Sequence, residues 1–366
     1  MKNLLTTLII CVVTLQVTSA QLKKWTLQEC VEYALEKKLD VAQFELDFAT
    51  AKIEERDALG SLLPDLNGDA TIQENRGLSF NPTSQEPVNT QLEFRGNLTS
   101  RVTLFDGLRN YRQLSRAKLN SIANQYRLDD LKDDISLNVA NGYLDVLSNK
   151  EQLKVAKAQY AVTEQDLNRT RELVNSGVAP RGDLLEIEAT AATQEQQITS
   201  TENQVLIARV SLAQLLQITD YENFDIADES FDIPPSDILS NSAKVIFDKA
   251  LTFRNDIKLS EANVKLAEKD LQISRGAYYP TVSAFLNYNA RYSDQNLNPL
   301  DLSIIPFTEQ LYTFDGLAYG FRLDVPFFNG WSSRNGVKRS KIALEQAKLS
   351  YDQTKLELES AIQLAY

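Results

Sequence analysis

Histidine is absent from this chain of 366 residues, and cysteine occurs only twice. Without imidazole, a histidine base, a histidine-activated nucleophile and the ordinary zinc or copper sites are excluded, because those sites depend on imidazole or on clustered thiolates. Carboxylates leave a hydrolase formally open, but they lie on predicted helices, where charge usually marks a solvated face. The candidates are Asp129-Asp130, Asp133-Asp134 and Glu186 with Glu188. We therefore predict that the protein is not an enzyme and has no catalytic, metal-binding or cofactor-binding residue.

Basic patches and long apolar runs are also lacking. The formal net charge is −12, and no cluster of lysine and arginine offers the phosphate contacts that a nucleic acid requires. After the N-terminal segment, no stretch approaches the ~18 to 20 continuous apolar residues of a spanning helix. We predict no nucleic-acid partner, and if the protein lies in a membrane, it does so with strands.

The N-terminus has the pattern of a secretory signal. Lys2 provides a positive start, residues 4–17 are largely apolar, and Thr18-Ser19-Ala20 precede Gln21. We predict a signal peptide over 1–20, cleaved between Ala20 and Gln21, with a buried N-terminal helix as the alternative. Cys11 would leave with this segment, and Ile9-Ile10 before it lack the small residue that lipid-attachment sites favour. Cys30 then stands alone, so no intrachain disulfide is expected.

A duplication organises the rest of the chain. Leu62-Leu63-Pro64 resembles Tyr278-Tyr279-Pro280, and the shift that aligns these two motifs also aligns Asp40 with Asp256. Leu104-Phe105-Asp106-Gly107 resembles Phe327-Phe328-Asn329-Gly330, with a slightly larger shift that also takes Tyr143 to Tyr366. We predict a first repeat over 21–219, a linker over 220–242 that packs as an irregular collar, and an incomplete second repeat over 243–366. Each repeat is predicted to run helix, two strands, helix.

Helical periodicity and capping signals set the predicted helices. They cover 26–60, 108–174, 183–217, 243–276 and 331–366, with a tip over 175–182. Thr26 and Glu29 form a potential capping box, and Asp183 is expected to cap the helix after the tip. The helix over 108–174 would extend about 100 Å, far more than a small globular core needs. A free coiled-coil spacer is the alternative interpretation of this region.

Four segments alternate between apolar and polar residues, which predicts strands over 66–75, 92–104, 282–292 and 317–327. Such strands suit a transmembrane barrel, but a soluble antiparallel sheet with one wet face has the same period. Aromatic residues near the strand ends favour the outer membrane: Tyr278, Tyr279, Phe327, Phe328 and Trp331. The charges expected to face a water-filled lumen are Asp69, Arg95, Arg101, Arg291, Arg322 and Asp324. Phe285 breaks the alternation.

In their order and duplication these motifs resemble the TolC-type outer-membrane efflux family. The resemblance rests on Trp25-Thr26-Leu27, on the two sets of duplicated motifs quoted above, and on Gly177 with Asp183-Leu184-Leu185 at the tip. It implies a mainly α fold with a β-barrel part, in which long antiparallel coiled coils form a periplasmic tunnel. It also implies a homotrimer whose chains each give four strands to a twelve-stranded barrel in the outer membrane of a Gram-negative bacterium.

The function implied by the resemblance is a channel that conducts small molecules, or a secreted protein, from the periplasm to the exterior. Its partners would be a periplasmic adaptor protein, an inner-membrane pump of the RND, ABC or MFS type, and outer-membrane lipid. The adaptor would dock at the tip, although Gly177 and Gly182 could serve only as turn residues. The predicted contact residues are Ser176, Gly177, Val178, Ala179, Pro180, Gly182, Asp183, Leu184 and Leu185.

The main alternative function is a periplasmic adaptor or a coiled-coil spacer of such a system. Adaptors do not repeat helix, strand pair, helix, so the duplication disfavours this alternative. The second repeat is expected to be incomplete, since Tyr366 aligns with Tyr143 of the first repeat, so either this sequence is a fragment or the protein is truncated. The carboxylates that line the periplasmic entrance in the family therefore cannot be named in this sequence.

Overall fold

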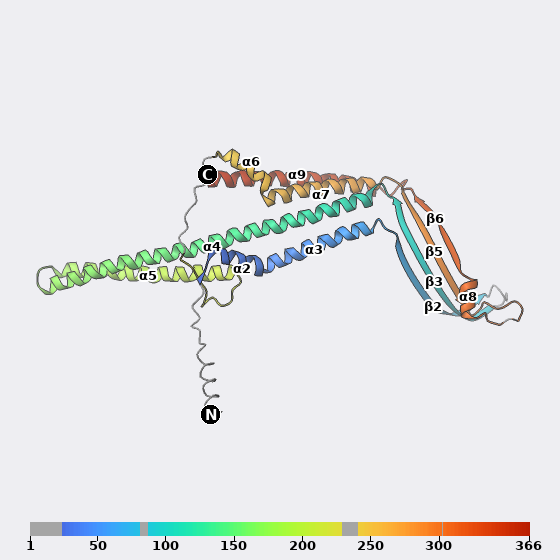
Figure 1. Cartoon of the computed structure of the whole chain (residues 1–366), viewed down its shortest axis with the longest axis horizontal. Coiled ribbons are helices and arrows are strands. Elements are labelled where there is room, and N and C mark those ends of the chain that lie inside the picture. The colour runs from blue at the N-terminus through green and yellow to red at the C-terminus, as the bar shows by residue number, and fades with distance from the viewer. Residues whose placement is uncertain (1–23, 81–86, 229–240, 302) are drawn as a thin grey trace, which may run out of the picture. The chain divides into compact units, whose positions relative to one another are not determined.

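The computed structural model describes residues 24–80, 87–228, 241–301 and 303–366 (Figure 1). The predicted signal peptide with its cleavage site at Ala20 and Gln21, and residues 229–240 of the predicted linker, lie outside the described residues. By its contacts the chain divides into two compact units, residues 1–45 with 128–240 and residues 46–127 with 241–366. These units cut across the two sequence repeats, because the long helices contribute to both.

The first unit is a helical bundle with a small parallel sheet. It contains α2 (Leu27–Lys37), the beginning of α3 (Leu39–Gly60), most of α4 (Arg109–Asn175), and α5 (Arg181–Leu215). The capping box predicted for Thr26 and Glu29 is present at the start of α2. Strand β1 (Lys24–Trp25) pairs in parallel with β4 (Asp225–Ile226). The sequence did not predict these two short strands, because two residues are too few to show a period.

The core of the first unit lies where β4 meets the helices. Tyr143, Leu212 and Ile226 are almost completely buried there, together with Cys30 of α2. Phe224 and Ile226 of the predicted linker are thus components of this core. Lys150 of α4 forms an ion pair with Asp225 at 2.7 Å and with Asp228 at 3.3 Å, which ties the same segment to the long helix.

The second unit joins an antiparallel sheet to a pair of long helices. Its strands are β2 (Asp65–Phe80), β3 (Pro87–Phe105), β5 (Thr281–Ser293) and β6 (Gly316–Asp324), in the order β2-β3-β5-β6. Helix α9 (Ser332–Ala365) packs along α7 (Asn255–Gly276) and α6 (Ala243–Phe253). The short helix α8 (Phe307–Thr313) lies between β5 and β6 in sequence and contacts β5 (Figure 1).

Two predicted helices are each interrupted once. The helices expected over 26–60 and 243–276 break at Lys38 and Arg254, where the backbone is extended, with ψ of 126° and 135°. Both breaks directly follow the short helices α2 and α6, and the shift that aligns Pro64 with Pro280 also aligns Lys38 with Arg254. Asp40 and Asp256 stand in the first turn of the new helix, where a carboxylate is favourable. The apolar period continues across each break, so the sequence pattern conceals it.

The strands end in a duplicated backbone turn. Gly107 and Leu108 have φ of +73° and +65°, and the equivalent Gly330 and Trp331 have φ of +60° and +64°. The equivalence follows the second alignment found in the sequence, in which Phe105 matches Phe328. Two successive left-handed residues therefore lead from the strands into each following helix.

The strand boundaries differ from the predicted ones by more than one residue at three ends. Strands β2 and β3 extend beyond 75 and before 92, because their hairpin pairing continues to Phe80 and Pro87 past an irregularity between Arg76 and Ser79. Strand β6 ends at Asp324 rather than 327. Pro326 follows, and proline has no amide hydrogen to donate to a neighbouring strand.

Candidate functional site

The register of the four-stranded sheet places the six predicted charges on one face. Directly opposite residues of antiparallel strands share a face, and so do residues two apart on one strand. Asp69 lies opposite Asn97, and Arg95 lies opposite Arg291. The remaining pairs on this face are Arg101 with Asp65, Arg322 with Ser283, and Asp324 with Thr281. We call this surface the polar face; that it lines a lumen stays a prediction.

The other face of the sheet is apolar and largely uncovered. Ile72 of β2 is 73% exposed and Phe321 of β6 is 76% exposed. Other exposed apolar side chains on this face are Leu66, Leu98, Leu286, Leu317, Tyr319 and Leu323. A soluble sheet with one wet face would bury this surface beneath another layer, because apolar area of this extent is unfavourable in water. The soluble-sheet alternative does not account for it.

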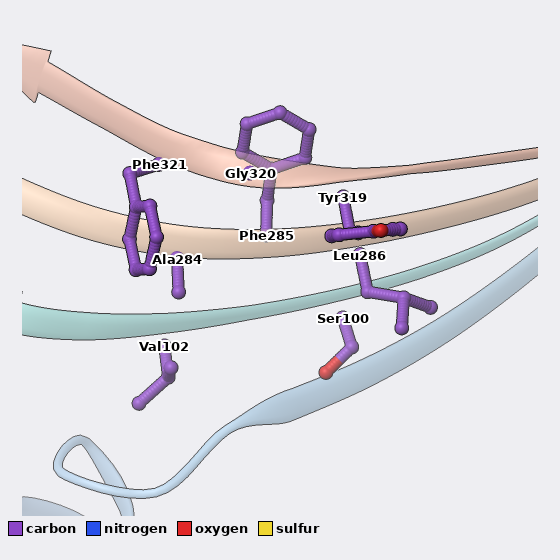
Figure 2. A pocket seen from close by; sticks show the side chains of 8 residues that line it. All are labelled: Ser100, Val102, Ala284, Phe285, Leu286, Tyr319, Gly320 and Phe321. Carbon is purple, nitrogen blue, oxygen red and sulfur yellow. The ribbon is translucent and has the colours of Figure 1, made fainter.

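Phe285, which broke the alternation, lies on the polar face. Its β6 partner is Gly320, and its ring occupies the space that a side chain on that glycine would take, 3.4 Å from the position of a Cβ. Figure 2 shows Phe285 pointing away from Ala284 and Leu286, its neighbours on β5, whose side chains lie on the apolar face. The glycine opposite it thus accommodates this aromatic ring on the polar face.

Polar and charged groups surround Arg95 and Arg291. Glu93 accepts a 2.8 Å hydrogen bond from Arg95, a 2.7 Å bond from Gln91 and a 3.3 Å bond from Gln73. The alternation that singled out Arg95 also places Glu93 and Gln91 on its face, so the sequence contained the signal for them. Phe314, whose ring lies 5.7 Å from the guanidinium of Arg291, comes from a loop and has no such signal.

The predicted tip residues form the turn between α4 and α5. The amide of Val178 donates to the carbonyl of Leu173 at 2.9 Å and that of Gly177 to Val174 at 3.0 Å, which is a Schellman motif. Gly177 has φ of +74°, so the turn requires its glycine. Val178 and Leu185 are exposed at this end of the hairpin. The turn and the first helical turn of α5 thus bring the predicted residues 176–185 together.

The prediction that Asp183 caps α5 was wrong. The helix begins at Arg181, its N-cap is Pro180, and no side chain caps it by a hydrogen bond. Asp183 lies inside the first turn, and its amide donates to the Pro180 carbonyl at 3.2 Å. Its carboxylate still favours the helix through the macrodipole, which is attractive to negative charge at this end.

The antiparallel sheet is open, with one exposed apolar face and one charged face, and it is attached to helices of up to 67 residues. This arrangement is typical of a membrane-inserted protein with a long helical part. None of the helices in the described ranges carries an apolar stretch long enough to cross a membrane. The family model of the outer membrane efflux proteins matches residues 33–216, and the chain belongs to this family. The chain is therefore an outer-membrane protein with a large periplasmic part, and its family is one of transport channels rather than enzymes.

Individual relatives agree with this assignment. The chain is 28% identical over 188 residues to the pyoverdine export outer membrane protein OpmQ of Pseudomonas aeruginosa, covering 50% of this chain and 39% of OpmQ. It is 22% identical over 269 residues to the proteases secretion protein PrtF of Dickeya chrysanthemi, covering 72% of this chain and 55% of PrtF. The chain thus spans about half the length of the curated relatives it matches.

Solved structures establish the fold. The Campylobacter jejuni CmeC outer membrane channel superposes with a TM-score of 0.76 at 16% sequence identity, over 92% of this chain and 70% of CmeC. The resemblance to the TolC-type family and the mainly helical fold class with an antiparallel strand part, both predicted from the sequence, are confirmed.

Proposed function

We propose that three copies of this chain form a channel that conducts solutes passively from the periplasm to the exterior. Each copy contributes the four strands of its sheet to a barrel of 3 × 4 = 12 strands, and its long helices to a periplasmic tunnel. No bond is made or broken during conduction. Opening is controlled by the helices at the tip.

The observation that best supports this proposal is the open sheet, which has one apolar face and one polar face. Four strands are too few to close around a lumen, and among the described strands β2 and β6 each pair on one side only. Unpaired strand edges favour pairing with another chain, and closure into a barrel removes them. In such a barrel the exposed apolar face meets lipid, and the polar face with its six predicted charges meets water.

The proposed partners are a periplasmic adaptor protein and, through it, an inner-membrane pump. The tip at residues 176–185 supports adaptor docking because it presents exposed apolar side chains, Val178 and Leu185, on a turn held by backbone hydrogen bonds. The relatives include a pyoverdine export protein and a proteases secretion protein, so small molecules and a secreted protein are both proposed as cargo.

The oligomeric state is the first test. Protein solubilised in detergent from outer-membrane fractions should be a trimer by native mass spectrometry or light scattering. A soluble monomer released from the periplasm would refute the channel and favour the adaptor or the coiled-coil spacer. If the protein is a trimer, a cross-linker attached at Val178→Cys should capture the adaptor. The control is Val155→Cys, an exposed position of α4 away from the tip, which should not capture it.

The orientation of the sheet is the second test. Arg95→Cys and Arg101→Cys should react with a membrane-impermeant maleimide in lipid vesicles, and Leu98→Cys on the opposite face should not. Cys30 is buried and provides a low background. If the arginine positions react only with lipid-phase probes while Leu98→Cys reacts from water, the polar face does not line a lumen.

A further inference from the structure

We infer that the hollow between β3 and β5 at Arg95 and Arg291 binds oxyanions, such as the carboxylate or phosphate groups of a passing solute. The inference rests on the proposed channel function, since it assigns a substrate class to the polar face. It begins from the register, which places two arginines directly opposite each other on neighbouring strands. One arginine comes from each sequence repeat, so only the pairing of the strands brings them together.

The hollow has the size and lining of a small-anion site. It encloses about 430 Å³ and is bordered by the two arginines and by the amide side chains of Asn97, Asn289, Gln295 and Asn296. Guanidinium and carboxamide groups both supply N–H donors, and a guanidinium presents them in a fork that matches a carboxylate or phosphate. Five donors on each arginine exceed what the protein acceptors around them use.

The acidic side chain that borders the hollow is already occupied by hydrogen bonds from the protein. Glu93 is the acidic residue that borders the hollow, and its side chain is only 15% exposed. Its oxygens accept hydrogen bonds from Arg95, Gln91 and Gln73. In the part of the chain that the structure describes, no hydrogen bond or ion pair engages the guanidinium of Arg291, which only faces the ring of Phe314 at 5.7 Å. One positive charge in the hollow therefore lacks a carboxylate.

Placing two arginines opposite each other works against folding. Like charges at directly opposite sheet positions are destabilising, whereas an opposite-charge pair is favourable. A third, anionic charge between the two guanidiniums reverses this repulsion. An oxyanion from solution is the group that this arrangement lacks.

A buried glutamine holds one rim of the hollow in place. Gln310 of α8 is fully buried and its oxygen accepts from the Ser293 amide at 2.9 Å and from the Asn296 side chain at 2.7 Å. Its nitrogen donates to the carbonyls of Ser293 at 2.9 Å and Ile305 at 2.7 Å. Ser293 and Asn296 both border the hollow, so this rim is fixed in position before any anion arrives.

In the proposed trimer, three such hollows would lie at one level of a water-filled barrel. Each hollow holds two arginines and one glutamate, and this net positive charge beside a low-dielectric wall concentrates anions there. Each hollow is open, so the anion can leave again, as conduction requires.

The test uses the full chain in lipid bilayers, inorganic phosphate as the probe, and a matched control. Arg95→Gln with Arg291→Gln removes the site. Arg76→Gln is the control, because Arg76 pairs with Glu74 at 2.9 Å much as Arg95 pairs with Glu93 at 2.8 Å, but lies on the opposite face of the sheet. Phosphate is titrated against chloride current at constant ionic strength, and its NMR line width is followed with the protein in detergent.

We expect phosphate to reduce the chloride current of the wild-type channel, and the NMR line of phosphate to broaden when it binds the wild-type protein. Loss of charge-assisted bonds worth about 1.5–3 kcal/mol should weaken both effects by roughly 10-fold to 100-fold in the double variant. Arg76→Gln should behave as wild type. Equal phosphate affinity in wild type and double variant would overturn the site.

Failure of the channel is distinguished from failure of the site. If the wild-type chain gives no current, the proposed function fails and the NMR measurement alone decides whether the site exists. If the double variant does not fold, Arg291→Gln and Arg291→Lys replace it. We expect the lysine variant to bind phosphate more tightly than the glutamine variant, and the reverse order would refute the site.

Discussion

The hydroxyl of Tyr143, in the middle of α4, donates a 2.8 Å hydrogen bond to the carbonyl of Ala227. The Ala227 amide in turn donates to the carbonyl of Trp25 at 2.8 Å, which continues the pairing of β1 with β4. One buried phenol therefore connects the long helix to two segments that are distant in the sequence. The same neighbourhood holds the ion pairs of Lys150.

Tyr143→Phe should lower the free energy of unfolding by about 1–3 kcal/mol, because it removes the hydroxyl that donates to the Ala227 carbonyl in the buried core. Chemical denaturation in detergent measures the change. Tyr160→Phe is the control, since Tyr160 is a half-buried residue of the same helix, outside the core, that donates to Glu195 at 3.2 Å. It should change stability by less than about 0.5 kcal/mol. Equal effects of the two substitutions would show that the Ala227 bond contributes nothing.

Asp228 makes the same junction pH-dependent. Partial burial acts to raise the pKa of Asp228, but the charge of Lys150 and hydrogen bonds from Lys24 and Lys150 outweigh it, so the pKa lies below its ordinary value of 3.8. A depressed native pKa means that folding favours the ionised carboxylate. Its stabilisation is complete above the ordinary pKa and is lost as the pH falls through the native one.

Asp228→Asn should therefore destabilise the protein at neutral pH, and the difference from wild type should shrink below pH 3.8 and vanish in stronger acid. Denaturation curves over a series of pH values measure it. The control is Glu151→Gln, which breaks an exposed ion pair with Lys154 on α4, the helix that carries Lys150. It should change the free energy of unfolding little at any pH. If the difference in unfolding free energy between wild type and Asp228→Asn grew as the pH fell, the ion pairs assigned to Asp228 would be contradicted.

Gly107 and Gly330 provide a matched pair at the two strand-to-helix turns. Alanine at either position takes a left-handed backbone, which costs roughly 1–2 kcal/mol. At Gly107 a Cβ would also meet the carbonyl of Gly276 at 2.6 Å and Tyr279 at 2.9 Å, whereas at Gly330 nothing lies within 4 Å. Overpacking adds about 1–3 kcal/mol, so Gly107→Ala should be clearly the more destabilising. Thermal unfolding followed by circular dichroism compares them, and equal midpoints would refute the close approach at Gly107.

Gln310→Leu should loosen the segment between β5 and β6. The substitution leaves the partly buried Ser293 amide and the carbonyls of Ser293 and Ile305 without their partner, at about 1–3 kcal/mol for each group that water cannot reach. Hydrogen exchange of peptides from 293–313 should accelerate, while those from α4 should not. Gln353→Leu, at an exposed position of α9 that donates to Glu357, should leave exchange in this segment unchanged. Unchanged exchange in Gln310→Leu would show that the glutamine does not hold the segment.

Local features of this protein could be predicted because they are encoded in neighbouring residues. The period of two around Arg95 is sufficient to give the strand and the face, and the long run without proline is sufficient to give α4. The duplication also gave the equivalence of Gly107 and Gly330 before any backbone angle was known. The helix breaks at Lys38 and Arg254 were missed since the apolar period is the same on both sides of them.

The sequence by itself determined the helices, the strands, the two faces of the sheet and the family, since each depends on short-range periodicity or on motif order. Only the tertiary structure decided that Arg95 lies opposite Arg291, that Tyr143 reaches Ala227 and that Gln310 is buried against Ser293. Strand register and buried hydrogen bonds depend on pairing between segments far apart in the chain, and a one-residue slip would change every such partner.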